Sequence, residues 1–270
     1  MTAFEEDFQR LRKLYASLGV TKGRTVFLTG NAGRVIRYRS RAREDVLRAH
    51  LSAIQDLLGP EGTILSPAAS MNLCNTDIPF DPVETPSHEM GALAEYIRIQ
   101  EGCVRSFHPF WSVSGLGPSA PVFLNDVSRH AYGWGSPWQR MAEHDVLQVN
   151  VGLHPSRAVT LIHHIEVVSG VPYRYTKEFN HPVVRNGNTS REDFYMNVMY
   201  RDADIERRHI LNEHFFENLS KHGTFNSFGE DRECAWSFSM TEFFKLTTKM
   251  LERNIYAYLE RPPSNRPYRN

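Results

Sequence analysis

The sequence predicts an α/β fold with a central mixed sheet flanked by helices and a smaller C-terminal α+β portion. Over the first 170 residues, stretches with helical spacing of apolar residues alternate with short apolar runs typical of buried strands. After about residue 183, two strand-like runs follow one another directly, which favours antiparallel pairing. The 270 residues, 41% of them hydrophobic, suffice for one large core. We therefore expect a single domain over residues 1–270.

The first elements are two amphipathic helices and two short strands. Apolar residues at helical spacing predict helices over residues 4–18 and 43–58, and the glycine that follows each stretch ends it. The apolar runs RTVFLT (24–29) and GTILSP (62–67) are predicted strands. This alternation is the main support for the α/β class.

The middle of the chain contains a long irregular segment. Residues 67–86 are rich in Pro, Asn and Asp, and a loop of this length in a compact domain usually serves a function. It leads into TPSHEMGALAEYIRIQEG, a predicted helix with Ser87 as its N-cap. Strands are then predicted at WSVSGLG (111–117) and VLQVNVGL (146–153), with SPWQRMAEH as a short helix between them.

The remaining elements begin with a helix at TLIHHIEVVSG (160–170). PVVRNG and DFYMNVMYRD are predicted antiparallel strands, and surface helices are predicted at IERRHILNEHFFENLSKHG (205–223) and MTEFFKLTTKMLERN (240–254). We expect the tail RPPSNRPYRN to be ordered only by docking on the rest of the chain.

Composition argues against several classes of protein. Lys and Arg together number 31, as do Asp and Glu, which disfavours a nucleic-acid binder. No apolar run approaches the roughly 20 residues needed to cross a bilayer, and the first residues lack a signal-peptide core. The three cysteines are isolated, so no disulfide framework or cysteine zinc site is expected. We expect a cytoplasmic protein without nucleic-acid or membrane partners.

The polar residues of TLIHHIEVVSG are the main chemical signal. Thr160, His163 and Glu166 stand at helical i, i+3 and i+6 positions, so a carboxylate one turn away could orient an imidazole that acts as a general base. A buried, mutually satisfied His–Glu pair is the alternative. A two-histidine metal site is weaker, because His163 and His164 point about 100° apart on a helix. Spacing alone leaves these interpretations open.

Two further stretches carry polar groups where a ligand could bind. Ser87, entering a helix after a proline, offers a hydroxyl and backbone N–H groups, although plain helix capping explains it as well. In RSFHPFWSVSGLG, Arg105 and Ser106 could hold a phosphate or carboxylate, and His108 lies in an extended segment before a proline. An ordinary surface pair is the alternative for these residues. No G-x-S-x-G, P-loop or G-x-G-x-x-G motif is present.

Five motifs in order carry a family resemblance: FDPVETPSHEMGALAEYIR (80–98), RSFHPFWSVSGLG (105–117), GSPW (135–138), TLIHHIE (160–166) and PYRYTK (172–177). Together they resemble the aminoglycoside 3-N-acetyltransferase family. The resemblance implies that family's own α/β fold, distinct from the common N-acetyltransferase fold. It also implies an acyl-CoA-dependent N-acyltransferase, with acetyl-CoA or another acyl-CoA as co-substrate and no metal.

The resemblance also implies roles for individual residues. His163 would be the general base and Glu166 would orient it, with Thr160 near the thioester sulfur and Ser87 near the acyl carbonyl. Where the family has H-S-S after the first strand, this chain has LTGNAG, whose backbone N–H groups could still cradle phosphates. The family's Asn before the motif's Thr is Val159 here. The residues expected on the cofactor side are Thr29, Gly30, Asn31, Gly91, Arg105, Ser106 and His108.

The acceptor is expected to be an amino sugar, in free or nucleotide-linked form, because the basic stretch RVIRYRSRAR (34–43) would repel a polycation. Aminoglycoside acetylation conferring antibiotic resistance is the close alternative. Residues 1–180 would form the CoA-binding and catalytic core, and residues 181–270 the acceptor side, with a homo-oligomer left open. Rival interpretations are a metal-dependent hydrolase using His163, His108 and Glu166, a binding protein that has lost its chemistry, and a serine hydrolase using Ser87.

Overall fold

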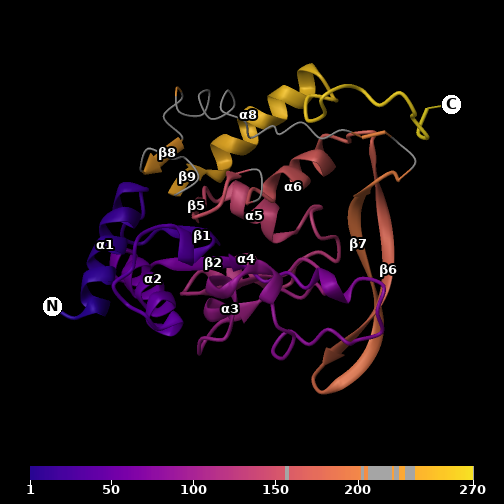
Figure 1. Ribbon diagram of the computed structural model, residues 1–270. Helices are drawn as coiled ribbons and strands as arrows, with labels where there is room; N and C mark the ends of the chain where they lie inside the picture. Colours follow the sequence, from indigo (N-terminus) through magenta and orange to yellow (C-terminus); the bar gives the residue numbers. More distant parts are fainter. Residues whose placement is uncertain (156–157, 202–203, 206–220, 222–224, 229–234, 270) are drawn as a thin grey trace.

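The computed structural model describes residues 1–155, 158–201, 204–205, 221, 225–228 and 235–269. Within these residues, seven strands form one sheet in the order β3-β4-β2-β1-β5-β9-β8 (Figure 1). The strands are β1 (Thr25–Gly30), β2 (Thr63–Pro67), β3 (Val104–Arg105), β4 (Val113–Leu116), β5 (Leu147–Val151), β8 (Phe225–Phe228) and β9 (Ala235–Ser239).

The centre of the sheet is parallel and its edges are antiparallel. β1 pairs in parallel with β2 on one side and with β5 on the other. β4 joins β2 antiparallel, and β9 joins β5 antiparallel. The predicted α/β class with a mixed central sheet is therefore confirmed. The side chains of the central strand β1 are buried on both faces of the sheet, as expected where helices cover both sides.

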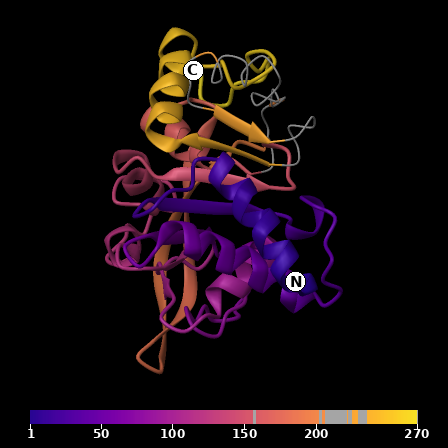
Figure 2. The ribbon, with the colours of Figure 1, turned by 90° about the vertical axis from the view of Figure 1, so that its left-hand side faces the viewer.

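Helices cover both faces of the sheet (Figures 1 and 2). Val26 and Leu28 of β1 belong to one core, and Phe27 belongs to the other, where its ring lies 5.2 Å from that of Trp138. The first core is covered by α1 (Ala3–Ser17), α2 (Arg43–Leu58) and α3 (Ala92–Arg98), and the second by α4 (Ala120–Leu124), α5 (Pro137–Glu143), α6 (Leu161–Val168) and α8 (Met240–Arg253).

A long two-stranded hairpin stands beside the sheet (Figure 1). It consists of β6 (Arg174–Arg185) and β7 (Asn188–Met199), paired over their full length. The hairpin packs on the rest of the molecule through Phe194, whose ring lies 6.2 Å from that of Phe107. The expected division at residues 180 and 181 falls in the middle of β6, and β9 belongs to the central sheet. The C-terminal part is thus built into the sheet.

The predicted helix start at Ser87 is wrong. Ser87 leads into a single 3-10 turn (His88–Met90) without capping it through its side chain. Gly91 follows with φ of +91°, a left-handed conformation that interrupts the helix, and α3 begins only at Ala92. The helices α1, α2, α5, α6 and α8 and the strands β1, β2, β4 and β5 lie where the sequence predicts them, whereas β3, α4, β8 and β9 were not predicted and β6 and β7 are longer than the predicted runs.

The C-terminal predictions have mixed outcomes. The predicted helix at 205–223 lies almost entirely outside the described residues. The tail is docked, as expected: the backbone N–H of Asn265 donates to Asp204 at 2.9 Å, and Arg266 lies over the ring of Tyr256. Among the described residues, no helix has the length and apolar character needed to cross a membrane.

Candidate functional site

Helix α6 brings the predicted histidine and glutamate together. His163 Nδ1 lies 3.0 Å from Glu166 Oε2, the i to i+3 contact that the sequence spacing predicts. Glu166 is only 3% exposed, whereas the His163 side chain keeps 19% of its surface in contact with solvent. Thr160 directly precedes the helix, is half-buried, and does not cap it through its side chain. The pair therefore combines a buried carboxylate with a partly accessible imidazole.

Two residues of the hairpin also contact the carboxylate. Arg174 Nε lies 2.9 Å from Glu166 Oε2, and the Tyr173 hydroxyl donates to Oε1 at 3.3 Å. Both side chains are buried. The sequence analysis missed these partners, although both lie in the PYRYTK motif. Their contact with α6 depends on how the hairpin packs, which residue spacing does not reveal.

The second histidine of the pair, His164, faces away from this cluster. Its Nδ1 lies 2.7 Å from the Tyr132 carbonyl oxygen, and its ring stacks on that of Phe244. Burial lowers the pKa of His164, which favours the neutral ring. The side chain of Tyr132 in turn lies against His163, with ring centroids 5.0 Å apart. His164 is thus a packing residue, and the two imidazoles do not share a face.

A separate cavity of about 500 Å³ lies where the chain leaves β1. The crossover from β1 leads to β2 on one side, while β5 lies on the other side, and such switch points of α/β sheets commonly bind ligands. Three predicted cofactor-side residues, Gly30, Asn31 and Gly91, line the cavity. The further lining residues, which the sequence analysis did not assign to a site, include Tyr38, Arg43, Leu47, Glu89, Met90 and Leu153.

Glycine at position 30 is required by the backbone. Its φ is +143°, and a Cβ there would lie 2.1 Å from the carbonyl oxygen of Val151. Asn31 continues this close approach, because its N–H donates to the same carbonyl at 2.7 Å. The Asn31 side chain then accepts from Gly33 N at 3.2 Å and starts a 3-10 turn. The end of β1 therefore presents backbone to the cavity.

Thr29 does not join its neighbours in the cavity wall. Its side chain is buried, and its hydroxyl accepts a hydrogen bond from Asn150 Nδ2 at 2.7 Å. The expected contact of Thr29 with the cofactor stays a prediction. The side chain points into the sheet because alternate residues of a strand face opposite sides.

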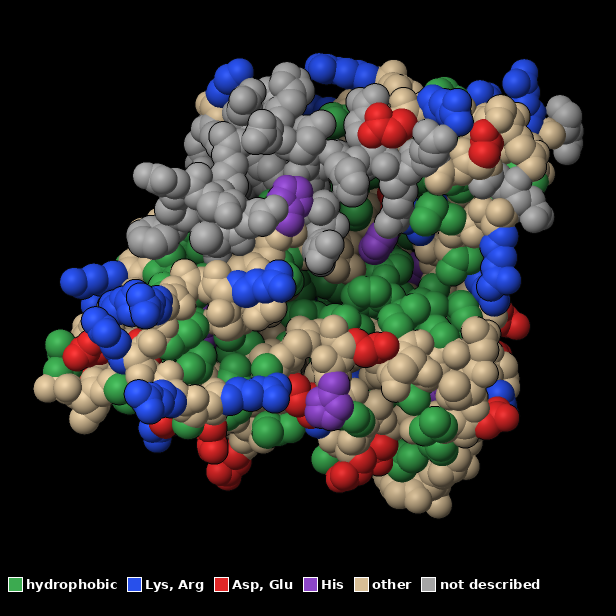
Figure 3. Space-filling model, in the orientation of Figure 1, with side chains coloured by type: hydrophobic (Ala, Val, Ile, Leu, Met, Phe, Trp, Pro, Cys, Tyr) green, Lys and Arg blue, Asp and Glu red, His purple; other side chains and the backbone are tan. Residues whose placement is uncertain are grey.

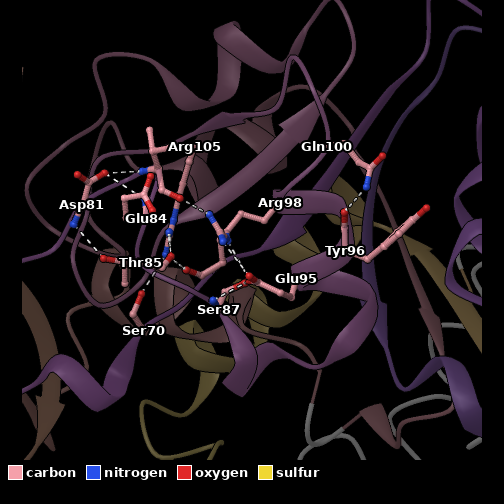
Figure 4. A network of polar contacts seen from close by, with 12 residues as sticks. Ser70, Asp81, Glu84, Thr85, Ser87, Glu95, Tyr96, Arg98, Gln100 and Arg105 are labelled. Atoms are coloured by element: carbon pink, nitrogen blue, oxygen red, sulfur yellow. Dashed lines mark hydrogen bonds and ion pairs between the residues drawn. The ribbon is translucent and has the colours of Figure 1, made fainter. Parts of the chain in front are cut away.

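Ser87 is held by an acidic partner inside the protein (Figure 4). Its N–H and its hydroxyl both donate to Glu95 Oε2, at 2.8 and 2.9 Å, and Arg98 forks the same carboxylate. Burial acts to raise the pKa of Glu95, but hydrogen bonds from Arg98 and Ser87 outweigh it and lower the pKa to about 2. Ser87 is fully buried and its hydroxyl donates to Glu95, an arrangement unlike that of a serine nucleophile, and its expected place near the acyl carbonyl stays a prediction.

Arg105 is likewise occupied within the protein. Its guanidinium donates to Ser112 Oγ, Ser70 Oγ and the carbonyl oxygens of Pro82, Thr85 and Ala68. These five bonds use all five of its N–H donors. The side chain thus ties residues 68–85, the long irregular segment, to β3 (Figure 4), and its expected contact with the cofactor stays a prediction.

Ser106 and His108 serve the same fold. Ser106 Oγ accepts from Val113 N at 2.9 Å, and His108 Nδ1 accepts from Phe110 N and Trp111 N at 3.3 and 3.2 Å. Both side chains are buried, and burial lowers the pKa of His108 to about 3. Both side chains are occupied within the fold, and their expected place on the cofactor side stays a prediction. In the described part of the chain, no three His, Cys, Asp or Glu side chains group as metal ligands would.

The face drawn in Figure 3 is hollowed in the middle, beside the β6–β7 hairpin, and hydrophobic side chains gather there. Apolar walls with a few polar groups are typical of small-molecule sites. The arrangement thus has three parts: a His–Glu pair on α6, an arginine and a tyrosine from the hairpin, and a backbone-lined cavity at the sheet switch point.

Comparisons with known proteins place the chain in a family. A family model described as aminoglycoside 3-N-acetyltransferase matches residues 41–252. Among curated relatives, aminoglycoside N(3)-acetyltransferase IX of Micromonospora chalcea is 25% identical over 174 residues, covering 58% of this chain and 59% of the relative. Aminoglycoside N(3)-acetyltransferase VII of Streptomyces paromomycinus is 26% identical over 196 residues, covering 66% of each. The chain thus aligns with about three fifths to two thirds of these relatives' lengths.

Solved structures share the fold. Aminoglycoside acetyltransferase AAC(3)-Xa matches with a TM-score of 0.75 and 21% identity, covering 91% of this chain and 92% of that one. AAC-IIIb, solved as a binary complex with CoASH, matches with a TM-score of 0.76 and 21% identity, covering 95% of this chain and 98% of that one. Because the family model spans more than three quarters of the sequence, the chain belongs to the aminoglycoside 3-N-acetyltransferase family.

Proposed function

We propose that the protein is an acyl-CoA-dependent N-acyltransferase that moves an acetyl or short acyl group to an amino group of an amino sugar. The observation that carries the proposal is the His163–Glu166 pair, a partly exposed imidazole held at 3.0 Å by a buried carboxylate. Acyl transfer to an amine needs a positioned base whose pKa lies near the working pH. The family membership of the chain adds to this support.

His163 acts on the attacking amine. Its Nδ1 faces Glu166, so the opposite ring nitrogen, Nε2, is the one that takes the proton as the amine nitrogen bonds to the thioester carbonyl carbon. The tetrahedral intermediate then collapses, the carbon–sulfur bond breaks, and the leaving sulfur takes the proton from the His163 imidazolium, so that CoA leaves as a thiol and the neutral imidazole is restored. Glu166 stabilises the imidazolium meanwhile. Thr160, at the start of the same helix, is proposed to lie toward the sulfur.

The donor binds in the cavity at the end of β1. Gly30 and Gly91 lack side chains there, which lets a phosphate or pantetheine group approach the backbone closely, and Arg43 supplies positive charge. AAC-IIIb, which shares the fold, was solved with CoASH. CoA carries several phosphate charges, so the basic segment 34–43 suits this donor end.

The acceptor belongs to the amino sugars. The position of the basic segment 34–43 helps to decide between a polycationic and a nucleotide-linked acceptor. Tyr38 and Arg43 lie at the donor cavity, against α1 and α2, whereas His163 lies on a helix of the opposite layer. The basic segment therefore lies away from the proposed base and does not argue against a polycationic acceptor. Repulsion by this segment was the reason for preferring a nucleotide-linked sugar. The curated relatives are named for aminoglycosides, which makes these the first acceptors to test.

The test is release of free thiol from acetyl-CoA with aminoglycosides and with nucleotide-linked amino sugars. We expect acceptor-dependent release by the wild type and a loss of about 10²- to 10⁴-fold in His163→Ala, because one positioned base contributes that much. His164→Ala is not a suitable control because that ring is packed in the core; His88→Ala, at an exposed position, should leave the rate unchanged. Unchanged turnover in His163→Ala would refute the proposed base, and no release with either panel would refute the transferase.

A further inference from the structure

We propose that Arg174 is a positioning residue that keeps His163 neutral and ready to accept a proton, by compensating the charge of Glu166. The inference rests on the proposed function of His163, but its central measurement does not require turnover. Arg174 is the first residue of β6, so the hairpin supplies the third member of the cluster on α6.

The geometry places one carboxylate oxygen between two basic groups. Glu166 Oε2 lies 3.0 Å from His163 Nδ1 and 2.9 Å from Arg174 Nε. The guanidinium also approaches the imidazole directly, with Arg174 Nη2 3.4 Å from His163 Nδ1. Its third nitrogen, Nη1, donates to the carbonyl oxygen of Asn197 in β7 at 3.1 Å, which fixes the group from the second strand of the hairpin.

Burial makes these charges effective. The Arg174 and Glu166 side chains are 5% and 3% exposed, so little water screens them. A lone carboxylate at 3.0 Å would stabilise the imidazolium and leave His163 already protonated at neutral pH, when it is needed as a base. With Arg174 beside it, the carboxylate and guanidinium cancel before proton transfer. Glu166 still orients Nδ1 through the hydrogen bond.

In the described part of the chain, burial favours the neutral form of the titratable side chains Tyr173, Tyr258 and His164 near the cluster. Tyr132 packs its ring on His163, and Tyr173 donates to Glu166 from the residue before Arg174. Burial raises the pKa of both Tyr173 and Tyr258, and both lie close enough to Glu166 to feel its charge. His164, the neighbour of His163 on α6, has a lowered pKa through burial. These groups shape the site without supplying a cation.

The experiment is an NMR titration of the histidine ring of residue 163, assigned by its loss in His163→Gln. We expect the pKa of His163 to rise by about 1 unit in Arg174→Gln, because an adjacent cation is removed while the carboxylate remains. Arg174→Lys keeps a cation and should stay near the wild type. Tyr173→Phe, which removes a neighbouring hydrogen bond but no charge, is the matched control and should also stay near the wild-type value.

An unchanged or lowered pKa in folded Arg174→Gln would overturn the proposal. If that variant does not fold, Arg174→Met keeps the packing of the side-chain stem and is titrated in its place. Where turnover is measurable, the acid limb of kcat/KM against pH should move upward by the same amount as the NMR value. A shifted NMR value without any turnover would support the role of Arg174 and reject the transferase, so the two failures are distinguishable.

Discussion

Two buried arginines illustrate how the same side chain serves different purposes at the residue scale. Arg105 donates all five of its N–H groups to oxygens of the protein. Arg174 contacts Glu166 and His163, and the His163 side chain is partly exposed to solvent. The residue type and its burial are alike, and the partners decide the difference.

Replacing Arg105 should therefore affect stability rather than cofactor binding. Arg105→Met removes five hydrogen bonds to oxygens of the protein, and we expect the free energy of unfolding to fall by about 3 kcal/mol. The KM for acyl-CoA of the folded fraction should not change. Urea denaturation and steady-state kinetics measure the two effects, with exposed Arg253→Met as the control. A KM that rises severalfold with little loss of stability would restore Arg105 to the cofactor site.

The residues that sequence alone identified are those whose partners are close in the chain. His163 and Glu166 meet because three residues separate them on a helix. Arg174 and Tyr132 reach the same histidine only through the packing of a hairpin and a loop, which no local spacing encodes. Motif position alone does not decide the role of Ser106 and His108, because a polar residue near a site can serve the fold as well as a ligand.

At the element scale, the end of β1 determines the shape of the proposed donor cavity. β1 and β5 approach there so closely that only a hydrogen atom fits on the Cα of residue 30. The cavity begins at this glycine and runs along the first residues after the strand. Its geometry depends on the contact between two strands rather than on a particular side chain.

Gly30→Ala tests that dependence. The added methyl group would meet Val151 O at 2.1 Å, and we expect a loss of more than about 2 kcal/mol in the free energy of unfolding, together with weaker acyl-CoA binding. Gly23→Ala is the matched control, because its φ is also positive but nothing lies within 4 Å of the new methyl group. It should cost about 1 kcal/mol. Equal losses in both, measured by thermal unfolding, would contradict the close approach at Gly30.

Elements were predictable where a buried stripe repeats with a clear period. α1 and α2 show this, and so do the fully buried runs of β1 and β2. The hairpin was only partly predictable, because β6 is largely polar and its length is fixed by cross-strand pairs such as Arg185 with Glu192. The start of α3 was missed because Ser87 is a good capping residue, but Gly91 adopts a left-handed backbone.

At the scale of the whole molecule, buried neutral histidines tie stability to pH. His50 bridges Tyr15 and Tyr38 between α1, α2 and the segment that lines the cavity, and burial lowers its pKa to about 4. Burial likewise lowers the pKa of His108 to about 3. Because both folded values lie below the unfolded value near 6.5, the unfolded chain takes up protons first as the pH falls.

We expect full stability above about pH 6.5 and a progressive loss as the pH falls from there toward 4. Urea midpoints measured between pH 8 and pH 5 would follow this loss before most carboxylates titrate. His50→Gln should flatten the dependence, while His88→Gln, at an exposed position, should leave its slope unchanged. A midpoint independent of pH over this range would show that the buried histidines do not govern acid stability.

The loop that packs against the two histidines of α6 also has an optical consequence. Trp134 is 70% exposed and stands edge-on to His164, whereas Trp138 and Trp236 are fully buried. Its emission is therefore the part of the tryptophan fluorescence most open to an aqueous quencher such as iodide. Tyr132, two residues before Trp134 in the chain, packs its ring against that of His163. The molecule thus carries its own fluorophore against His164, the residue that follows the proposed base on α6, and a ligand that changes the exposure of Trp134 can be followed without a label.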